Sequence, residues 1–373
     1  MVKGKKVYAS ERDIKQEIPS EKSKFDHDTI LKYTIIFVLI FQNAGQFLFT
    51  RYAVTRPQEQ FLTSVAIFFM EVVKFITSFI LLYFTNRSFI KTLKDIKHCF
   101  FTNWLETLKV GIPALAYTLQ NLLFYLGIEN LETATFMVIH QLRVLTTAAF
   151  TVSILKRRLS LLQWISLVIL IIGVSLVQLN AEEGTKNPTG VSNSNETKII
   201  TNTVSPKHNN PIIGLGAALG SAILSGFAGV YFEKVVKMSD VSIWMRNFQL
   251  SALSLPISAV MIIVINGKAV YQKGLMQGFD WVVWGVVFYL ALGGIIVAVT
   301  IKYADNILKT FATSLSIIVG TIAAIYVFND WPGLLFLVGA PLVIVSVAIY
   351  SIFPYKESPS EITAEEGTVD QEE

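Results

Sequence analysis

The chain has 373 residues, of which 53% are apolar and only 16% are charged. A soluble domain is closer to one-quarter charged, and this apolar content suffices for roughly ten membrane-spanning helices of about 20 residues each. The net charge of +4 is small and the basic residues are scattered, which argues against nucleic-acid binding. The single cysteine, Cys99, excludes an internal disulfide and a cysteine-based metal site. We expect no metal and no cofactor.

The two ends of the chain are polar. Residues 1–32 carry eight Lys or Arg with no apolar run of a signal peptide behind them, so we interpret them as a cytosolic tail. Residues 354–373 are acidic, contain Pro and Ser and are too poor in apolar side chains to pack. We expect this second tail to be disordered and cytosolic.

Between the tails lie ten apolar stretches, each suited to a membrane-spanning helix. They cover about 33–50, 61–84, 107–127, 133–155, 161–179, 211–232, 242–265, 280–300, 308–328 and 333–353. An even number of spans places both tails on one side. That side holds about 20 Lys or Arg against about 7 on the other, which indicates that it is cytosolic. The sequence therefore predicts an all-α integral membrane protein.

The longest internal loop covers about 180–210 and is rich in Asn, Thr, Ser and Gly. It contains the glycosylation sequon Asn195-Glu196-Thr197 and follows the fifth predicted helix, so it falls on the non-cytosolic side. Asn195 is therefore the predicted glycosylation site.

The same loop divides the spans into two halves of five, residues 33–179 and 211–353. If the halves are repeats, the odd number of helices in each half makes the second half inverted in the membrane, as in many secondary transporters. At an offset of 166 residues three polar or small positions coincide. The coincident pairs are Arg143 with Lys309, Thr147 with Thr313, and Gly173 with Gly339.

Arg143 is the clearest functional candidate, because a charge near the bilayer centre usually faces a cavity or a partner. It lies ten residues into the fourth predicted span. His140, three residues before it, and Thr147, four residues after it, share its helix face. A guanidinium in a cavity is suited to bidentate binding of phosphate. The alternative is a buried ion pair with Glu71.

Other polar residues in the spans also leave two interpretations open. Glu71 and Lys74 are spaced to neutralise each other or to support a site. Gln120 and Asn121 could bind a nucleobase edge or hydrogen-bond to a neighbouring helix. A polar cluster begins the ninth span and is either functional or an ordinary solvated helix end; it consists of Lys302, Asp305, Asn306 and Lys309.

An enzyme finds little support in the sequence. Of the four histidines only His140 lies in a predicted span, and there is no HExxH motif or pair of intramembrane aspartates. The sequence also contains no filter-like loop, which an ion channel would need.

Several stretches closely resemble the nucleotide-sugar transporters of the Golgi, in the group that carries UDP-galactose, UDP-N-acetylglucosamine and CMP-sialic acid. They are LETLKVGIPALAYTLQNLLFYLGIENLETATF, HQLRVLTTAAFTV, LQWISLVILIIGVSLVQ, SGFAGVYFEKVVK, WMRNFQL and IKYADNILKTFATSLSIIVGTIAA. The resemblance runs from about Lys32 to Ile352 and omits the loop. It implies a drug/metabolite transporter fold of ten helices in two inverted repeats, working by alternating access as an antiporter.

The resemblance also implies site residues. The family lysines of QLK and KYxDNIxK, which contact phosphate, correspond to Arg143 and Lys309. The LQN pair that faces the nucleotide corresponds to Gln120 and Asn121, and the asparagine of RNxQ corresponds to Asn247.

The fourth span departs from the family pattern YQVTYQLK. Phe136 and Met137 stand for the first Tyr-Gln, His140 for the second Tyr and Arg143 for the Lys. We expect Phe136 to stack on a base or ribose and His140 to contact substrate. Supporting or gating roles are expected for Glu71, Lys74, Lys302, Asn306 and Thr313.

The expected function is exchange of a cytosolic UDP-sugar, UDP-galactose or UDP-N-acetylglucosamine, for luminal UMP across the Golgi membrane. A CMP-sialic acid carrier, a non-transporting scaffold and an intramembrane enzyme remain the alternatives, and the endoplasmic reticulum remains the alternative location. Besides nucleotide and lipid, the partners left open are a second copy of the chain and Golgi glycosyltransferases.

Overall fold

The computed structural model describes residues 21–56, 58–59, 61–131, 133–186, 210–328 and 331–355. Asn195 and most of both predicted tails lie outside the described residues.

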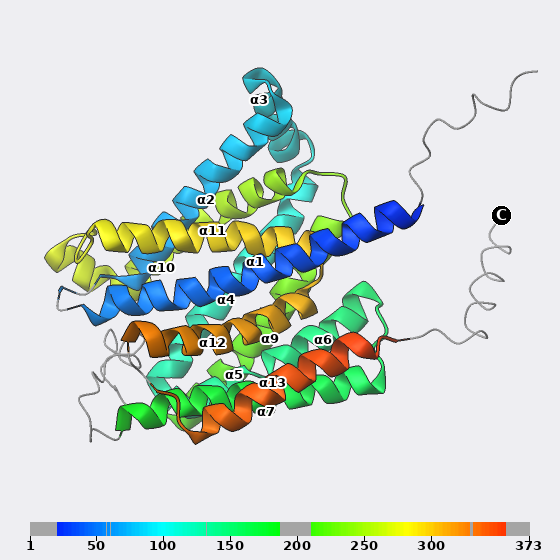
Figure 1. Ribbon diagram of the computed structural model, residues 1–373. Coiled ribbons are helices and arrows are strands. Elements are labelled where there is room, and N and C mark those ends of the chain that lie inside the picture. Colours follow the sequence, from blue (N-terminus) through cyan, green and yellow to red (C-terminus); the bar gives the residue numbers. More distant parts are fainter. Residues whose placement is uncertain are drawn as a thin grey trace, which may run out of the picture.

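Ten helical segments of the described chain are long and apolar enough to cross a bilayer, which confirms the predicted all-α, multi-pass architecture (Figure 1). Nine of these segments are single helices, and α5 with α6 makes the fourth. The spanning helices are α1 (Glu21–Thr55), α2 (Thr63–Asn86), α4 (Trp104–Asn130), α5 (Thr133–His140) with α6 (Arg143–Leu155), α7 (Leu161–Lys186), α9 (Pro211–Lys237), α10 (Ile243–Lys273), α11 (Trp281–Tyr303), α12 (Asn306–Phe328) and α13 (Leu334–Ile352).

A short helix, α3 (Phe89–Lys97), and one turn of π-helix, η1 (His98–Thr102), connect α2 to α4. Both ends of the described chain lie at the same side of the bundle, which we call the tail side; the opposite side is the loop side (Figure 1). The tail side is the predicted cytosolic side.

Helix ends follow local capping signals. Ser242 and Asp280 cap α10 and α11 by accepting backbone N–H groups at 3.2 and 3.0 Å. Asn210 caps α9, where Pro211 occupies the first helical position. Three helices extend clearly past the predicted apolar stretches: α1 begins at Glu21, α7 continues to Lys186 and α10 continues to Lys273.

The helix contacts of the two halves mirror each other. In the first half α1 packs against α11 and α12, and in the second half its counterpart α9 packs against α4 and α6 (Figure 1). The remaining large contacts join α2 to α10 and α7 to α13, which are counterparts of each other. This is the arrangement that a two-fold relation between five-helix halves would produce.

The contact between α7 and α13 depends on two glycines. A Cβ on Gly173 would lie 2.9 Å from the backbone nitrogen of Val343, and a Cβ on Gly339 would lie 2.7 Å from the carbonyl oxygen of Gly173. Any side chain at either position would therefore push the helices apart. Because these glycines are also 166 residues apart, equivalent positions of the two halves meet each other.

Polarity is distributed as expected of a protein in lipid. Large apolar side chains such as Phe37, Ile263 and Tyr326 are exposed on the outside of the bundle. The interior, in contrast, holds fully buried polar side chains, including Glu233, Arg246 and Gln249. Buried charges are costly unless they are paired or functional, so the interior polar groups indicate where the site lies.

Candidate functional site

The fourth span is broken in the middle. Helix α5 ends at His140, residues Gln141 and Leu142 form a turn, and α6 begins at Arg143. No side chain caps the new helix start. The backbone N–H groups of Gln141, Leu142 and Val144 remain bonded to carbonyls one turn earlier at 3.0–3.2 Å, so the turn makes the span irregular without leaving a free half-helix end. Arg143 therefore directly follows an irregular turn in the middle of the span.

Lys309 occupies a matching position in the second half. It lies in the first turn of α12, where its backbone N–H donates to the carbonyl of Asp305 at 3.0 Å. Helices α6 and α12, which carry Arg143 and Lys309, contact each other. Two cations near helix starts thus come from the two halves of the chain onto neighbouring helices.

Neither cation is neutralised by the described part of the protein. Within the described ranges, no hydrogen bond or ion pair engages the side chain of Arg143 or Lys309, and both are half-buried. A cation in the first turn of a helix is disfavoured by about 0.3–1 kcal/mol, and mutual repulsion adds to this cost. An anion bound between the two side chains would remove both penalties.

His140 and Phe136 lie beside this pair but are covered. Their rings stack at a centroid distance of 5.6 Å and an angle of 13°. Phe136 is fully buried against α4 and α9. Nε2 of His140 is buried and has no hydrogen-bond partner among the described residues. In this conformation Phe136 positions His140, and His140 retains an unused polar atom.

The predicted nucleobase contacts are divided between two places. Asn121 lines a small cavity of about 70 Å³ between α2, α4 and α10, together with Glu71 and Tyr117. Gln120 is half-buried on α4. Asn247, on α10, is almost completely buried, and its Nδ2 has no partner among the described residues. An unpartnered buried amide is unusual and is expected where a ligand supplies the missing contact.

Glu71 and Lys74 form the ion pair that their spacing predicts, with Nζ 2.8 Å from Oε1. Glu71 therefore does not neutralise Arg143, as the alternative required. The second carboxylate oxygen of Glu71 is buried without a described partner, so this acid keeps one free acceptor near the Asn121 cavity.

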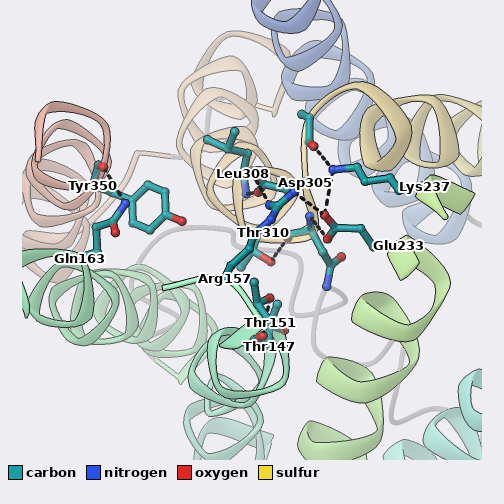
Figure 2. Close-up of polar contacts among 12 residues, drawn as sticks. Thr147, Thr151, Arg157, Gln163, Glu233, Lys237, Asp305, Leu308, Thr310 and Tyr350 are labelled. Atoms are coloured by element: carbon teal, nitrogen blue, oxygen red, sulfur yellow. Dashed lines mark hydrogen bonds and ion pairs between the residues drawn. The ribbon is translucent and has the colours of Figure 1, made fainter. Parts of the chain in front are cut away.

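A network of polar contacts surrounds Glu233 (Figure 2). The carboxylate of Glu233 is fully buried and accepts from Lys237 at 2.9 Å and from the backbone N–H of Asn306 at 2.9 Å. Arg157 reaches both Glu233 and Asp305 at 3.4 Å, and Lys237 also donates to the carbonyl of Ala304.

We call these four side chains, Arg157, Glu233, Lys237 and Asp305, the Glu233 network. It ties the loop after α6, the end of α9 and the start of α12 to one another. Through the backbone of Asn306 and the side chain of Asp305, the network lies directly at the start of α12, the helix that carries Lys309.

The remaining predicted residues lie around this network. Asn306 is buried at the start of α12, where its side chain contacts Gly229; a Cβ there would clash with the amide. Thr313 donates to the carbonyl of Lys309 at 2.9 Å. Lys302 lies over the ring of its neighbour Tyr303 and is not paired with Asp305.

Sequence reasoning missed two parts of this site, the break at Gln141 and the Glu233 network. The break contains no Pro or Gly, so no local signal marked it. Glu233 did carry a signal, because an acid directly after the apolar stretch 211–232 requires a partner if it is buried.

A family profile described as nucleotide-sugar transporter matches residues 27–351. The chain belongs to the nucleotide-sugar transporter family. It is 43% identical to the UDP-galactose translocator of Homo sapiens over 86% of this chain and 77% of that protein. It is also 42% identical to the UDP-galactose/UDP-N-acetylglucosamine transporter srf-3 of Caenorhabditis elegans, over 86% of this chain and 82% of that protein.

The UDP-N-acetylglucosamine transporter of Rattus norvegicus is 39% identical over 87% of this chain and 96% of that protein. A solved crystal structure that is 13% identical superposes with a TM-score of 0.58, covering 86% of this chain and 96% of the other. At that identity the likeness concerns the fold alone. These relatives are named as transporters, in agreement with the expectation that the chain is not an enzyme.

Proposed function

We propose that this protein exchanges a UDP-sugar for UMP across the Golgi membrane by alternating access. The observation that carries the proposal is the pair Arg143 and Lys309, two unpaired cations in the first turns of α6 and α12. A diphosphate brings about two negative charges, which would compensate this pair, and it must leave water to reach the middle of a membrane.

Exchange follows from the same charge argument. With no anion bound, the two cations repel each other in a half-buried site, which makes the empty carrier costly to reorient. UMP presents the same uridine and a phosphate of similar charge, so it compensates the pair on the return step. The carrier would therefore move in either direction only when it is loaded.

The choice of a UDP-sugar rests on the relatives, which are named for UDP-galactose and UDP-N-acetylglucosamine. Gln120, Asn121 and Asn247 supply amide donors and acceptors for the uracil edge, and His140 supplies the free Nε2. The Glu233 network closes the tail side, so this conformation would release substrate on the loop side, the predicted lumen.

The experiment is uptake into liposomes that contain the purified protein. We expect saturable uptake of UDP-galactose or UDP-N-acetylglucosamine, with the nucleotide sugar recovered unchanged. Preferential uptake of CMP-sialic acid would replace the proposed substrate, and absence of uptake of every nucleotide sugar would contradict the proposed function. Recovery of a chemically altered product would instead indicate an enzyme.

Topology and location have their own test. Tags at both ends should become accessible when only the plasma membrane is permeabilised, and Asn195 should accept a glycan that is lost in Asn195→Gln. A luminal amino terminus would contradict the proposed orientation.

A further inference from the structure

The segment between α2 and α4 does not cross the membrane, and its side chains divide into three arcs around the helix axis. The first arc faces the protein. Ile96, Cys99 and Phe100 pack against a cluster around Phe248 of α10. This side therefore fixes α3 and η1 to the bundle.

The second arc is apolar and has no protein against it. Ile90, Leu93 and Phe101 are 68%, 46% and 76% exposed. At 100° per residue Ile90 and Leu93 lie about 60° apart on α3, on the flank next to the protein-facing arc, and Phe101 follows on the π-helical turn η1. Large apolar side chains gathered on one face are unfavourable in water and mark a surface that something else covers.

The third arc is basic. Lys94 and Lys91 lie about 40° and 100° from Ile90, on the side away from the protein-facing arc. Lys97, in contrast, lies within the apolar arc, between Leu93 and Ile90. All three lysines are exposed, and none of the described residues forms an ion pair with them.

Residues 87–102 contain four Lys or Arg and one Asp, a net charge of 4 − 1 = +3 with His98 neutral. A short helix with apolar side chains on one flank and lysines on the other is typical of segments that lie in the surface of an anionic bilayer.

An apolar groove continues from η1 onto the start of α4. Its volume is about 460 Å³, and it is lined by Trp104, Leu105 and Leu108 with Lys109 beside them. The three apolar side chains are 56–58% exposed. A phospholipid whose headgroup meets the lysines of α3 would lay an acyl chain along this groove.

The segment is also connected to the proposed substrate site. Phe100 contacts the ring of Phe248 at a centroid distance of 6.0 Å, and Phe248 stacks on Phe75 at 4.4 Å. Phe248 directly follows Asn247, a proposed substrate contact. In addition, Thr107 of α4 donates to the carbonyl of Cys99 at 2.7 Å and accepts from Gln249 of α10 at 2.7 Å.

We propose that α3 and η1 form an interfacial segment that binds anionic phospholipid through Lys91, Lys94 and Lys97, and that this lipid supports transport. The first part, binding of phospholipid, is argued only from the exposed side chains of this segment. The second part rests on the proposed function, because it acts through α10 and Asn247.

Depth in the bilayer is the direct test. Cys99→Ser removes the single cysteine, so a new cysteine can carry a polarity-sensitive fluorophore. In vesicles of phosphatidylcholine and phosphatidylserine, label at Ile90→Cys should be blue-shifted and quenched by nitroxides on the acyl chains. Label at Lys91→Cys, about 100° away on the same helix, should remain in water. Equal quenching at both positions, or none at either, would overturn the interfacial assignment.

Regulation is tested by uptake of the nucleotide sugar in vesicles with increasing phosphatidylserine. Each lysine near an anionic surface contributes about fivefold to binding. The double variant Lys91→Gln with Lys94→Gln should therefore bind the anionic surface roughly 25-fold more weakly, and its transport rate should rise far less with phosphatidylserine than that of the unmodified chain. The matched control, Lys268→Gln with Lys273→Gln, removes two exposed charges elsewhere and should respond as the unmodified chain does.

An unchanged lipid response in the Lys91 and Lys94 variant would overturn the regulatory part. Absence of uptake in all vesicles would instead contradict the proposed function, and the fluorophore measurement would still decide whether α3 lies in the bilayer.

Discussion

Arg143 and Lys309 are placed where folding alone would not place them. Each lies in the first turn of a helix, where a positive side chain opposes the helix dipole. Buried or half-buried cations are normally paired with an acid, yet Glu71 pairs with Lys74, and Glu233 pairs with Lys237 and Arg157. Arg143 and Lys309 are thus available to an external anion.

Because of this placement, replacing Arg143 should lower transport without lowering stability. Charge-assisted hydrogen bonds contribute about 1.5–3 kcal/mol, so Arg143→Ala should lose roughly ten- to a hundredfold in apparent affinity for the nucleotide sugar. Its melting temperature should stay the same or rise slightly, because an unpaired cation leaves a helix N-terminus. Arg143→Lys keeps the charge without the bidentate fork and should retain partial uptake. Uptake assays and thermal unfolding in detergent measure both quantities.

A destabilised Arg143→Ala that regains stability when Glu71 is neutralised would show an ion pair in another conformation. Normal uptake by Arg143→Ala would exclude the phosphate role.

At the residue scale, the sequence predicts which charged residues are candidates for the site better than it predicts how the side chains around them are packed. The offset of 166 residues and the family resemblance both select Arg143 and Lys309, because a charge inside an apolar stretch is visible without a structure. The burial of Phe136 against α4 and α9 was not predictable, since an aromatic residue in an apolar span has the same pattern whether it faces a cavity or a neighbour.

At the scale of elements, the Glu233 network joins three segments that would have to separate before substrate could enter from the tail side. Glu233→Gln keeps the shape of the side chain but removes the charge that holds Lys237 and Arg157. Each lost charge-assisted bond is worth about 1.5–3 kcal/mol, so the open population should rise at least roughly tenfold.

Thiol labelling measures this opening. In a Cys99→Ser background, Thr310→Cys on α12 should react faster with a membrane-impermeant reagent added from the tail side when Glu233→Gln is present. Glu59→Gln, which disrupts only the exposed pair with Lys273, is the control and should leave the labelling rate unchanged. The same rate with and without Glu233→Gln would mean that the network does not close the tail side.

The loop side is held by a pair with a different pH dependence. Arg56 donates to both carboxylate oxygens of Asp280 at 2.7 and 3.1 Å, and this bonding holds the pKa of Asp280 at about 2, below its usual 3.8. A lowered carboxyl pKa stabilises the folded state at all pH values above the unfolded value, and this stabilisation disappears as pH falls through about 2.

The difference in melting temperature between the unmodified chain and Asp280→Asn should therefore be constant from pH 8 to pH 5. It should narrow progressively below about pH 5, where the unfolded carboxyl begins to bind a proton. A difference that vanished between pH 7 and pH 5 would contradict this account.

Among the elements, the ten spans were predictable because each must fill the bilayer with about 20 apolar residues. The break between α5 and α6 was not, because Gln141 and Leu142 have no helix-breaking tendency and the turn depends on surrounding helices. The segment α3–η1 was also missed, since nine residues are too few to span a membrane and its amphipathic pattern is short.

At the scale of the whole molecule, the mirrored contacts of α1 and α9 give the two halves equivalent surroundings. A carrier of this kind can open to one side by the movement that closes the other. Its substrate site then lies near the pseudo-two-fold axis that relates the two halves. Arg143 and Lys309 come one from each half, so the ligand proposed between them would bridge the halves in either conformation. The closed Glu233 network on one side fits one of these two states.

Counterflow tests this account most directly. Liposomes containing the protein are preloaded with UMP or left empty, and the initial uptake of UDP-galactose and UDP-N-acetylglucosamine is compared, with Arg143→Ala as the control. The account predicts several-fold faster uptake into the UMP-loaded vesicles and no acceleration in the variant. Equal initial rates in loaded and empty vesicles would contradict exchange at a shared cation site.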